Sequence, residues 1–209
     1  MRCCCKKRRK RCGSGGQRRG KIVGRVEIEQ RCPRVEARST IGHWESDTVI
    51  ERNHKYLLVT LVERKTGFTL VRKVRSRQAD GVAAATIDAL KPLSNLVNII
   101  TFDKGLDFTH HVRFSETIGA KVDFADPYSY WQRSTHENWN GLLRQGSPKR
   151  RCLSGITSAR PQAGELTLNG RARKISAWLT SAEALFPPAK RANVVLKYWM
   201  KIIFFNLLL

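Results

Sequence analysis

The sequence predicts an α/β fold in which a mixed five-stranded sheet is flanked by helices. Residues 56–62 and 97–102 are near-continuous apolar runs, which is typical of strands buried on both faces. Residues 79–90 instead carry apolar side chains at a spacing close to 3.6, which indicates a helix. A chain of 209 residues that is 41% hydrophobic is large enough for one domain with a real core.

The chain begins with a strongly basic segment. Residues 1–25 contain eleven Lys and Arg residues and no acid, so they cannot bury a core. They either contact phosphates or form a solvated tail. Residues 26–40 mix charged and short apolar positions around Pro33, which indicates an irregular course. We therefore expect a basic arm and linker over residues 1–38.

The next three strands are expected to form an antiparallel meander. They cover residues 42–50, 56–62 and 68–74, and Lys65-Thr66-Gly67 is a turn signal between the second and the third. On the first strand Glu45 and Asp47 share one face, because side chains alternate along a strand. Either acid could be a metal ligand, and the alternative for each is a surface acid.

The helix at 79–90 is expected to end at Lys91-Pro92. The strand that follows, 97–102, leads directly into Asp103, and Gly105 permits a sharp turn after it. Ligand sites in open sheets with helices lie at the carboxyl ends of strands. Asp103 is therefore well placed for chemistry.

The second half of the chain begins with a helix over 108–118, which Gly119 ends, and a strand over 121–125. Residues 128–131 form an aromatic loop that either stacks on bases or is pinned to the core. A helix that opens near residue 135 would place Glu137, Asn140 and Arg144 on one face.

The pattern weakens from residue 148 to residue 188, apart from two basic clusters and a helix over about 181–187. The final stretch, 194–209, is apolar but has 16 residues and two lysines, whereas a bilayer span needs roughly 20 apolar residues. A helix packed on the core is favoured there over a membrane anchor.

Charge indicates the class of partner. The chain carries 39 Lys and Arg against 17 Asp and Glu, a formal net charge of +22. Such a surface attracts polyanions, nucleic acid before anionic membrane. The six cysteines lack zinc-site spacing, which favours free thiols in a reducing cytoplasm. We hypothesise that an acid of the first strand meets Asp103 and Glu137, binds divalent metal ions and acts on a nucleic acid backbone.

With these residues the chain resembles the catalytic half of bacterial insertion-sequence transposases typified by insertion sequence thirty. That group lies within the acidic-triad (DDE) transposase and retroviral integrase superfamily. Thirty-three residues separate Asp103 from Glu137, the spacing that this group favours, and the match covers about residues 8–186. The matching segments are Gly42-His43-Trp44-Glu45-Ser46-Asp47, Thr101-Phe102-Asp103-Lys104-Gly105, Asp126-Pro127-Tyr128-Ser129, Trp131-Gln132-Arg133, Glu137-Asn138, Asn140-Gly141-Leu142-Leu143-Arg144-Gln145 and Pro148-Lys149.

The resemblance implies an RNase H-like fold over residues 39–187 and a catalytic triad of Asp47, Asp103 and Glu137. It thereby favours Asp47 over Glu45 at the first strand. It also implies two Mg²⁺ or Mn²⁺ ions, which suit carboxylate oxygens and a reaction of DNA strand cleavage and strand transfer. The DNA-binding residues expected from the basic arm, the clusters and the third-acid helix are Arg8, Arg9, Arg11, Arg133, Asn140, Arg144, Lys149, Arg171, Arg173 and Lys174.

The chain also departs from the family pattern. The helix-turn-helix segments that usually precede the core are missing, so we expect an N-terminally truncated copy. His136, Trp139 and Ala172 replace the usual residues, and 188–209 form an atypical apolar tail. Two alternatives follow, a catalytically inactive DNA-binding remnant and a general RNase H-like nuclease. The expected partners are element ends, target DNA and further copies of the chain, without a membrane, in the bacterial cytoplasm near the nucleoid.

Overall fold

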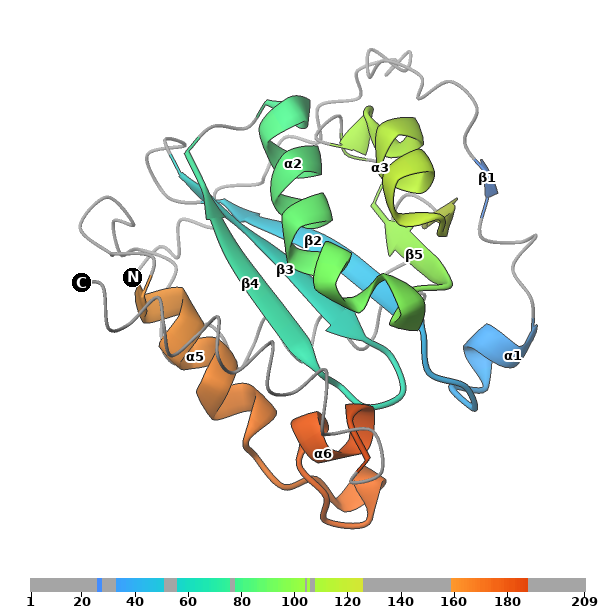
Figure 1. Ribbon diagram of the computed structural model, residues 1–209, viewed down its shortest axis with the longest axis vertical. Coiled ribbons are helices and arrows are strands. Elements are labelled where there is room, and N and C mark those ends of the chain that lie inside the picture. The colour runs from blue at the N-terminus through green and yellow to red at the C-terminus, as the bar shows by residue number, and fades with distance from the viewer. Residues whose placement is uncertain are drawn as a thin grey trace, which may run out of the picture.

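The computed structural model describes residues 26–27, 33–50, 56–75, 78–103, 105, 108–125 and 159–187. They form one mixed sheet in the order β1-β6-β5-β2-β3-β4, with α2 and α3 packed across one face (Figure 1). The predicted α/β class and all five predicted strands are confirmed. The sixth strand, β1 (Val26–Glu27), pairs in parallel with β6. Both β1 and α1 (Pro33–Glu36) lie in the segment that was predicted to be irregular. They were not predicted because elements this short show no periodicity in the sequence.

The antiparallel meander consists of β2 (His43–Ile50), β3 (Leu57–Glu63) and β4 (Thr69–Val74). Glu63 determines the turn between β3 and β4. Its buried carboxylate accepts hydrogen bonds from the backbone N–H groups of Thr66 and Lys65, at 2.7 and 3.0 Å. Gly67 follows at φ +68°, a left-handed conformation that favours glycine.

The parallel half of the sheet consists of β5 (Ile99–Phe102) and β6 (Lys121–Phe124), and β5 also pairs in parallel with β2. These parallel connections run through α2 (Ala79–Leu90) and α3 (His111–Ile118). The predicted bounds of α2 are confirmed, but the chain continues as a 3-10 helix, η2 (Lys91–Leu96), because Pro92 lies in its first turn, where proline is tolerated. Gly119 ends α3 at φ +76°, as predicted.

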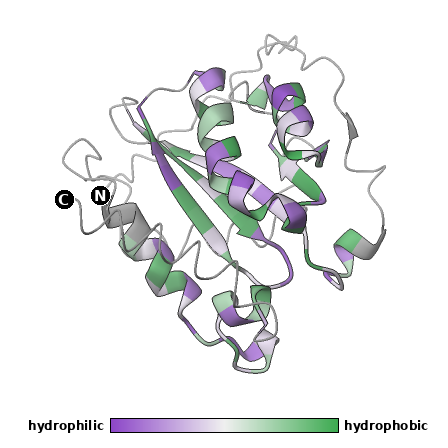
Figure 2. Ribbon diagram, in the orientation of Figure 1, coloured by the Kyte–Doolittle hydropathy of each residue, from purple (hydrophilic) through white to green (hydrophobic). Residues whose placement is uncertain are grey.

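The main core lies between the sheet and these two helices. Trp44 is fully buried there, its ring meets Phe68 edge to face, and its Nε1 donates to the Leu96 carbonyl at 2.9 Å. Along α2 hydrophobic residues alternate with hydrophilic ones (Figure 2). The buried residues of α2 are Val82, Ala83, Thr86, Ala89 and Leu90.

Strand β4 is the last strand of the sheet, and its outer edge is covered by α5 (Ala159–Asn169) (Figure 1). This helix was not predicted from the sequence. The Asn169 amide accepts from the Thr69 N–H at 2.8 Å and donates to the Thr69 carbonyl at 2.7 Å. The Glu165 carboxylate accepts from the Val71 N–H at 2.9 Å. Polar side chains therefore take the place of a further strand and protect the edge from pairing with another chain.

The described chain ends with η5 (Lys174–Ser176) and α6 (Ser181–Leu185). Helix α6 begins where the sequence predicted, because Thr180 and Glu183 form a capping box. Phe186 packs edge to face on Phe68, which attaches this segment to the sheet. Among the described residues no helix is long and apolar enough to cross a bilayer, and residues 188–209 lie outside them.

Candidate active site

The register between β2 and β5 brings the first two predicted acids together. The pairs are His43 with Ile99, Trp44 with Ile100, and Glu45 with Thr101. Two residues further along each strand direction stand Asp47 and Asp103. Neighbouring strands are about 4.8 Å apart, so this register, continued by two residues, would bring the two aspartates to neighbouring positions just after the carboxyl end of β5.

Side-chain alternation places Asp47 on the sheet face opposite α2 and α3. Trp44, Ile100 and Phe102 lie in the core under the helices, and side chains alternate along a strand. Asp47 therefore projects to the other face, and Asp103 would do so if the alternation of β5 continued for one more residue. Both are partly exposed, so their carboxylates have access to solvent and to a ligand.

Glu45 differs from Asp47, although the two share this face. Its side chain is 0% exposed and forms an ion pair with the guanidinium of Arg64, with Oε1 and Nη1 3.3 Å apart. Arg64 is itself buried and also reaches Glu36, with Nη2 and Oε2 3.5 Å apart. Glu45 thus has a cation within the fold.

The turn after β5 holds the carboxylate of Asp103. The Gly105 N–H donates to Asp103 Oδ1 at 2.9 Å. A Cβ atom at position 105 would lie 2.8 Å from the same oxygen, closer than real Cβ contacts allow. A side chain at position 105 would therefore displace the Asp103 carboxylate, and the Gly105 N–H helps to orient it. Sequence reasoning assigned this glycine only to a turn.

Asp47 is held from its other side by β3. Thr60 is its partner in the antiparallel register, and the Thr60 hydroxyl donates to the Asp47 carbonyl at 3.1 Å. Sequence reasoning missed Thr60 and Arg64 as supports of the acidic strand. The only available signal was their position in the hairpin, and that needs the register of β2 against β3.

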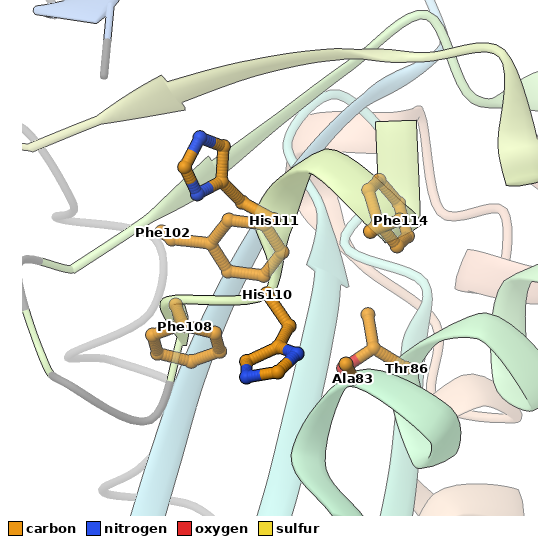
Figure 3. A pocket seen from close by; sticks show the side chains of 7 residues that line it. All are labelled: Ala83, Thr86, Phe102, Phe108, His110, His111 and Phe114. Carbon is orange, nitrogen blue, oxygen red and sulfur yellow. The ribbon is translucent and has the colours of Figure 1, made fainter. Parts of the chain in front are cut away.

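One small cavity lies on the helical face, between α2, β5 and α3 (Figure 3). Its volume is about 10 Å³, room for no more than one water molecule. The lining residues are Ala83, Thr86, Phe102, Phe108, His110, His111 and Phe114. This cavity is too small for a substrate and lies across the sheet from the two acids.

Comparison with known proteins bears on the identity of this site. The integrase core domain family matches residues 37–130, a range that includes Asp47 and Asp103. The transposase for insertion sequence element IS4351 of Bacteroides fragilis is 37% identical over 171 residues, which are 82% of this chain and 52% of that protein. Transposase InsI for insertion sequence element IS30C of Escherichia coli is 36% identical over 165 residues, 78% of this chain and 43% of that protein.

The chain carries a match to the integrase core domain family and is similar to transposases of the insertion-sequence-thirty group over 78–82% of its length. It spans about half the length of the curated relatives it matches. Solved structures agree on the fold. The catalytic core domain of BIV integrase aligns with a TM-score of 0.54 at 18% identity, covering 76% of this chain and 99% of that one. The HTLV-2 integrase catalytic core domain in complex with magnesium also gives 0.54, at 17% identity, over 69% of this chain and 95% of that one. The predicted RNase H-like fold is confirmed.

The other predicted site residues divide into two groups. Glu137 and seven of the DNA-binding candidates lie outside the described residues, as do the aromatic loop and the helix expected near residue 135. Those seven are Arg8, Arg9, Arg11, Arg133, Asn140, Arg144 and Lys149. Within the described ranges no group of three or more His, Cys, Asp or Glu side chains could hold a metal ion, so the full triad stays a prediction.

The three DNA-binding candidates that the structure describes differ in exposure. Arg171 and Lys174 are exposed. Arg173 is half-buried, and its Nε donates to the Ser181 hydroxyl at 2.7 Å. Burial, and secondly the charge of Arg171, lower the pKa of Arg173 from its ordinary value.

Proposed function

We propose that this chain is the catalytic core of a transposase that performs metal-dependent DNA strand cleavage and strand transfer. The observation that carries the proposal is the parallel register of β2 with β5, which, continued by two residues, brings Asp47 level with Asp103, in a chain similar to transposases of this group. Both acids keep solvent access, whereas the neighbouring Glu45 is buried against Arg64. This difference supports Asp47 over Glu45 as the first acid of the triad.

The donor set fits a hard divalent cation. Two carboxylates on one open face offer the oxygen ligands that Mg²⁺ and Mn²⁺ prefer. We propose that Asp47, Asp103 and Glu137 hold two such ions. The ions, when bound, supply Lewis-acid stabilisation of the attacking and leaving oxygens in phosphoryl transfer. That the related HTLV-2 core was solved with magnesium supports this choice.

The described residues of this chain orient the acids. The Gly105 N–H fixes one oxygen of Asp103, and the hydrogen bond from Thr60 fixes the Asp47 backbone. The Glu45–Arg64 ion pair anchors β2 to the β3–β4 turn directly before Asp47. Rigid placement of both acids is what metal binding at a shared site requires.

DNA is the proposed substrate, as element ends and as target. The net charge of +22 supports a polyanionic partner. Phosphate contacts are proposed for Arg171 and Lys174, and contacts to DNA for Arg8, Arg9, Arg11, Arg133, Asn140, Arg144 and Lys149. A homo-oligomer on DNA is proposed as well, supported by the dimeric and trimeric forms of the HTLV-2 core. The proposed location is the bacterial cytoplasm near the nucleoid.

The test is Mn²⁺-dependent nicking of supercoiled DNA by the purified chain. Asp103→Asn and Glu137→Gln each remove one proposed ligand, and Asp88→Asn is the control because Asp88 is an exposed acid on α2. We expect nicking by the parent and by Asp88→Asn, and none by the other two, with DNA binding retained. Nicking by Asp103→Asn would refute the triad assignment. Absence of nicking in every variant, with binding retained, would instead identify the chain as an inactive DNA-binding remnant.

A further inference from the structure

The segment between α5 and α6 presents an aromatic side chain to solvent. Trp178 is 70% exposed and Leu179 is 47% exposed. Among the described residues the exposed large hydrophobic side chains are these two and Val112, so two of the three are adjacent in one turn. We call residues 171–180 the tryptophan turn.

Hydrogen bonds hold this turn in a defined conformation. The Trp178 N–H donates to the Arg173 carbonyl at 2.9 Å, and the Arg173 N–H donates to the Leu179 carbonyl at 3.1 Å. The Arg173 guanidinium is tied to Ser181, the first residue of α6, by the Nε bond at 2.7 Å. The exposure of Trp178 is therefore built into the fold, and the half-buried Arg173 maintains it.

The backbone of the turn is also strained. Ala177 and Trp178 have φ values of +50° and +66°, the left-handed region that residues with a Cβ rarely adopt. Such strain persists only where the surroundings impose it, and it is concentrated at functional sites. Here the strained stretch includes Trp178, whose side chain is 70% exposed.

The charge of the turn identifies the kind of partner. Arg171, Arg173 and Lys174 lie within it, and no Asp or Glu occurs between Glu165 and Glu183. Glu165 is buried and paired with Arg72, and Glu183 caps α6. The exposed indole is thus accompanied by two exposed cations, Arg171 and Lys174, in a stretch without acids. This combination fits nucleic acid, whose bases stack on aromatic rings and whose phosphates attract cations.

We propose that the tryptophan turn is a second DNA contact, in which Trp178 stacks on or wedges between bases while Arg171 and Lys174 contact the adjacent phosphates. Arg173 acts as a positioning residue. The inference rests on the proposed function for the identity of the polyanion as DNA. Phe186 attaches this segment to Phe68, which packs against Trp44 near the start of β2, whereas Asp103 follows the end of β5. The turn would therefore hold DNA away from the bond that is cut.

The test measures the affinity of the full chain for a fluorescently labelled duplex with an unpaired tail, by anisotropy without metal. Trp178→Ala is compared with Val112→Ala, which truncates the other exposed hydrophobic side chain. Lys174→Ala is compared with Lys91→Ala, which removes an exposed charge elsewhere. We expect Trp178→Ala to weaken binding roughly tenfold, Trp178→Phe to keep most of the affinity, and both controls to change it less than about twofold. Lys174→Ala should reduce the salt dependence more than Lys91→Ala does.

A second measurement covers the case in which Trp178→Ala does not fold. Tryptophan fluorescence is recorded on addition of DNA for the parent and for Trp178→Phe. Because the chain has four other tryptophans, stacking of Trp178 is supported by quenching that is larger in the parent than in the variant. Equal DNA affinity of Trp178→Ala and Val112→Ala would overturn the inference. It would also be overturned if Trp178→Ala changed the oligomeric mass of the protein but not its DNA affinity, because the exposed ring would then contact another copy of the chain. The nicking assay on the parent chain separates this inference from the proposed function. If the parent nicks DNA and Trp178→Ala binds DNA as tightly as the parent, only the DNA contact at the tryptophan turn is refuted. If DNA affinity depends on Trp178 but the parent does not nick DNA, only the proposed function is refuted.

Discussion

Carboxylates in two regions of the sheet have opposite environments. In the half formed by β3, β4 and α5, Glu63 and Glu165 are 0% and 3% exposed. Glu63 accepts hydrogen bonds from the backbone N–H groups of Lys65 and Thr66, and Glu165 accepts one from the Val71 N–H. At the junction of β2 and β5, Asp47 and Asp103 are partly exposed, and the register of the two strands, continued by two residues, would bring them level with each other. Glu45 lies on β2, between these two regions, and is buried in an ion pair with Arg64. The difference teaches that a buried acid held by hydrogen bonds supports the fold, whereas partly exposed acids can also be reached by a ligand from solvent.

The largest effect on stability is expected from breaking the ion pair between Glu45 and Arg64. Arg64→Met would leave Glu45 buried without its cation, which costs about 3–5 kcal/mol of unfolding free energy. Chemical denaturation measures the loss. The double variant Glu45→Leu with Arg64→Met should recover most of it, because no charge is then buried alone. If Arg64→Met has the stability of the parent, Glu45 does not depend on this ion pair.

The second prediction concerns Asp103, one of the two partly exposed aspartates. Gly105→Ala places a methyl group against Asp103 Oδ1, and that flexible carboxylate can move aside. We therefore expect an unfolding free energy within about 1 kcal/mol of the parent. If Asp103 is the acid that we propose, nicking should fall roughly 100-fold, because a displacement near 1 Å is costly at a catalytic centre. The control is Gly164→Ala, since a Cβ atom there meets no atom within 4 Å. Full nicking activity of Gly105→Ala would show that the orientation of Asp103 does not depend on this turn.

The edge of β4 offers a third, smaller test. Asn169→Ala removes both hydrogen bonds to Thr69 and leaves buried backbone groups unpaired, at a cost of about 1–3 kcal/mol. Thr167→Ala on the exposed side of α5 is the matched control. Thermal unfolding distinguishes the two variants. Equal melting temperatures would mean that α5 does not need this side chain in order to cover the edge.

The same contrast explains how much could be predicted from the sequence. Strands β3 and β5 were predictable because apolar runs such as Leu57–Val62 require burial on both faces. Helix α5 was missed because its buried side includes Glu165 and Asn169, so it lacks the apolar stripe on which helix prediction depends. Asp103 could be placed at the end of a strand. Its neighbour Asp47 could be distinguished from Glu45 only by family resemblance, because the choice depends on where Arg64 folds back.

The smallest expected effects come from two left-handed positions, one occupied by alanine and one by glycine. Ala177→Gly in the tryptophan turn removes strain at φ +50° and should stabilise the chain by up to about 1 kcal/mol, since the entropy of glycine in the unfolded chain offsets part of the gain. Gly119→Ala is the converse, because φ is +76° and a Cβ atom there meets nothing within 4 Å, so only backbone strain is added. It should cost about 1 kcal/mol. Denaturation midpoints that move in opposite directions would establish that Ala177 is strained. A midpoint lowered by Ala177→Gly would mean that the turn adopts its conformation without strain, and that strain then plays no part in directing Trp178 into solvent.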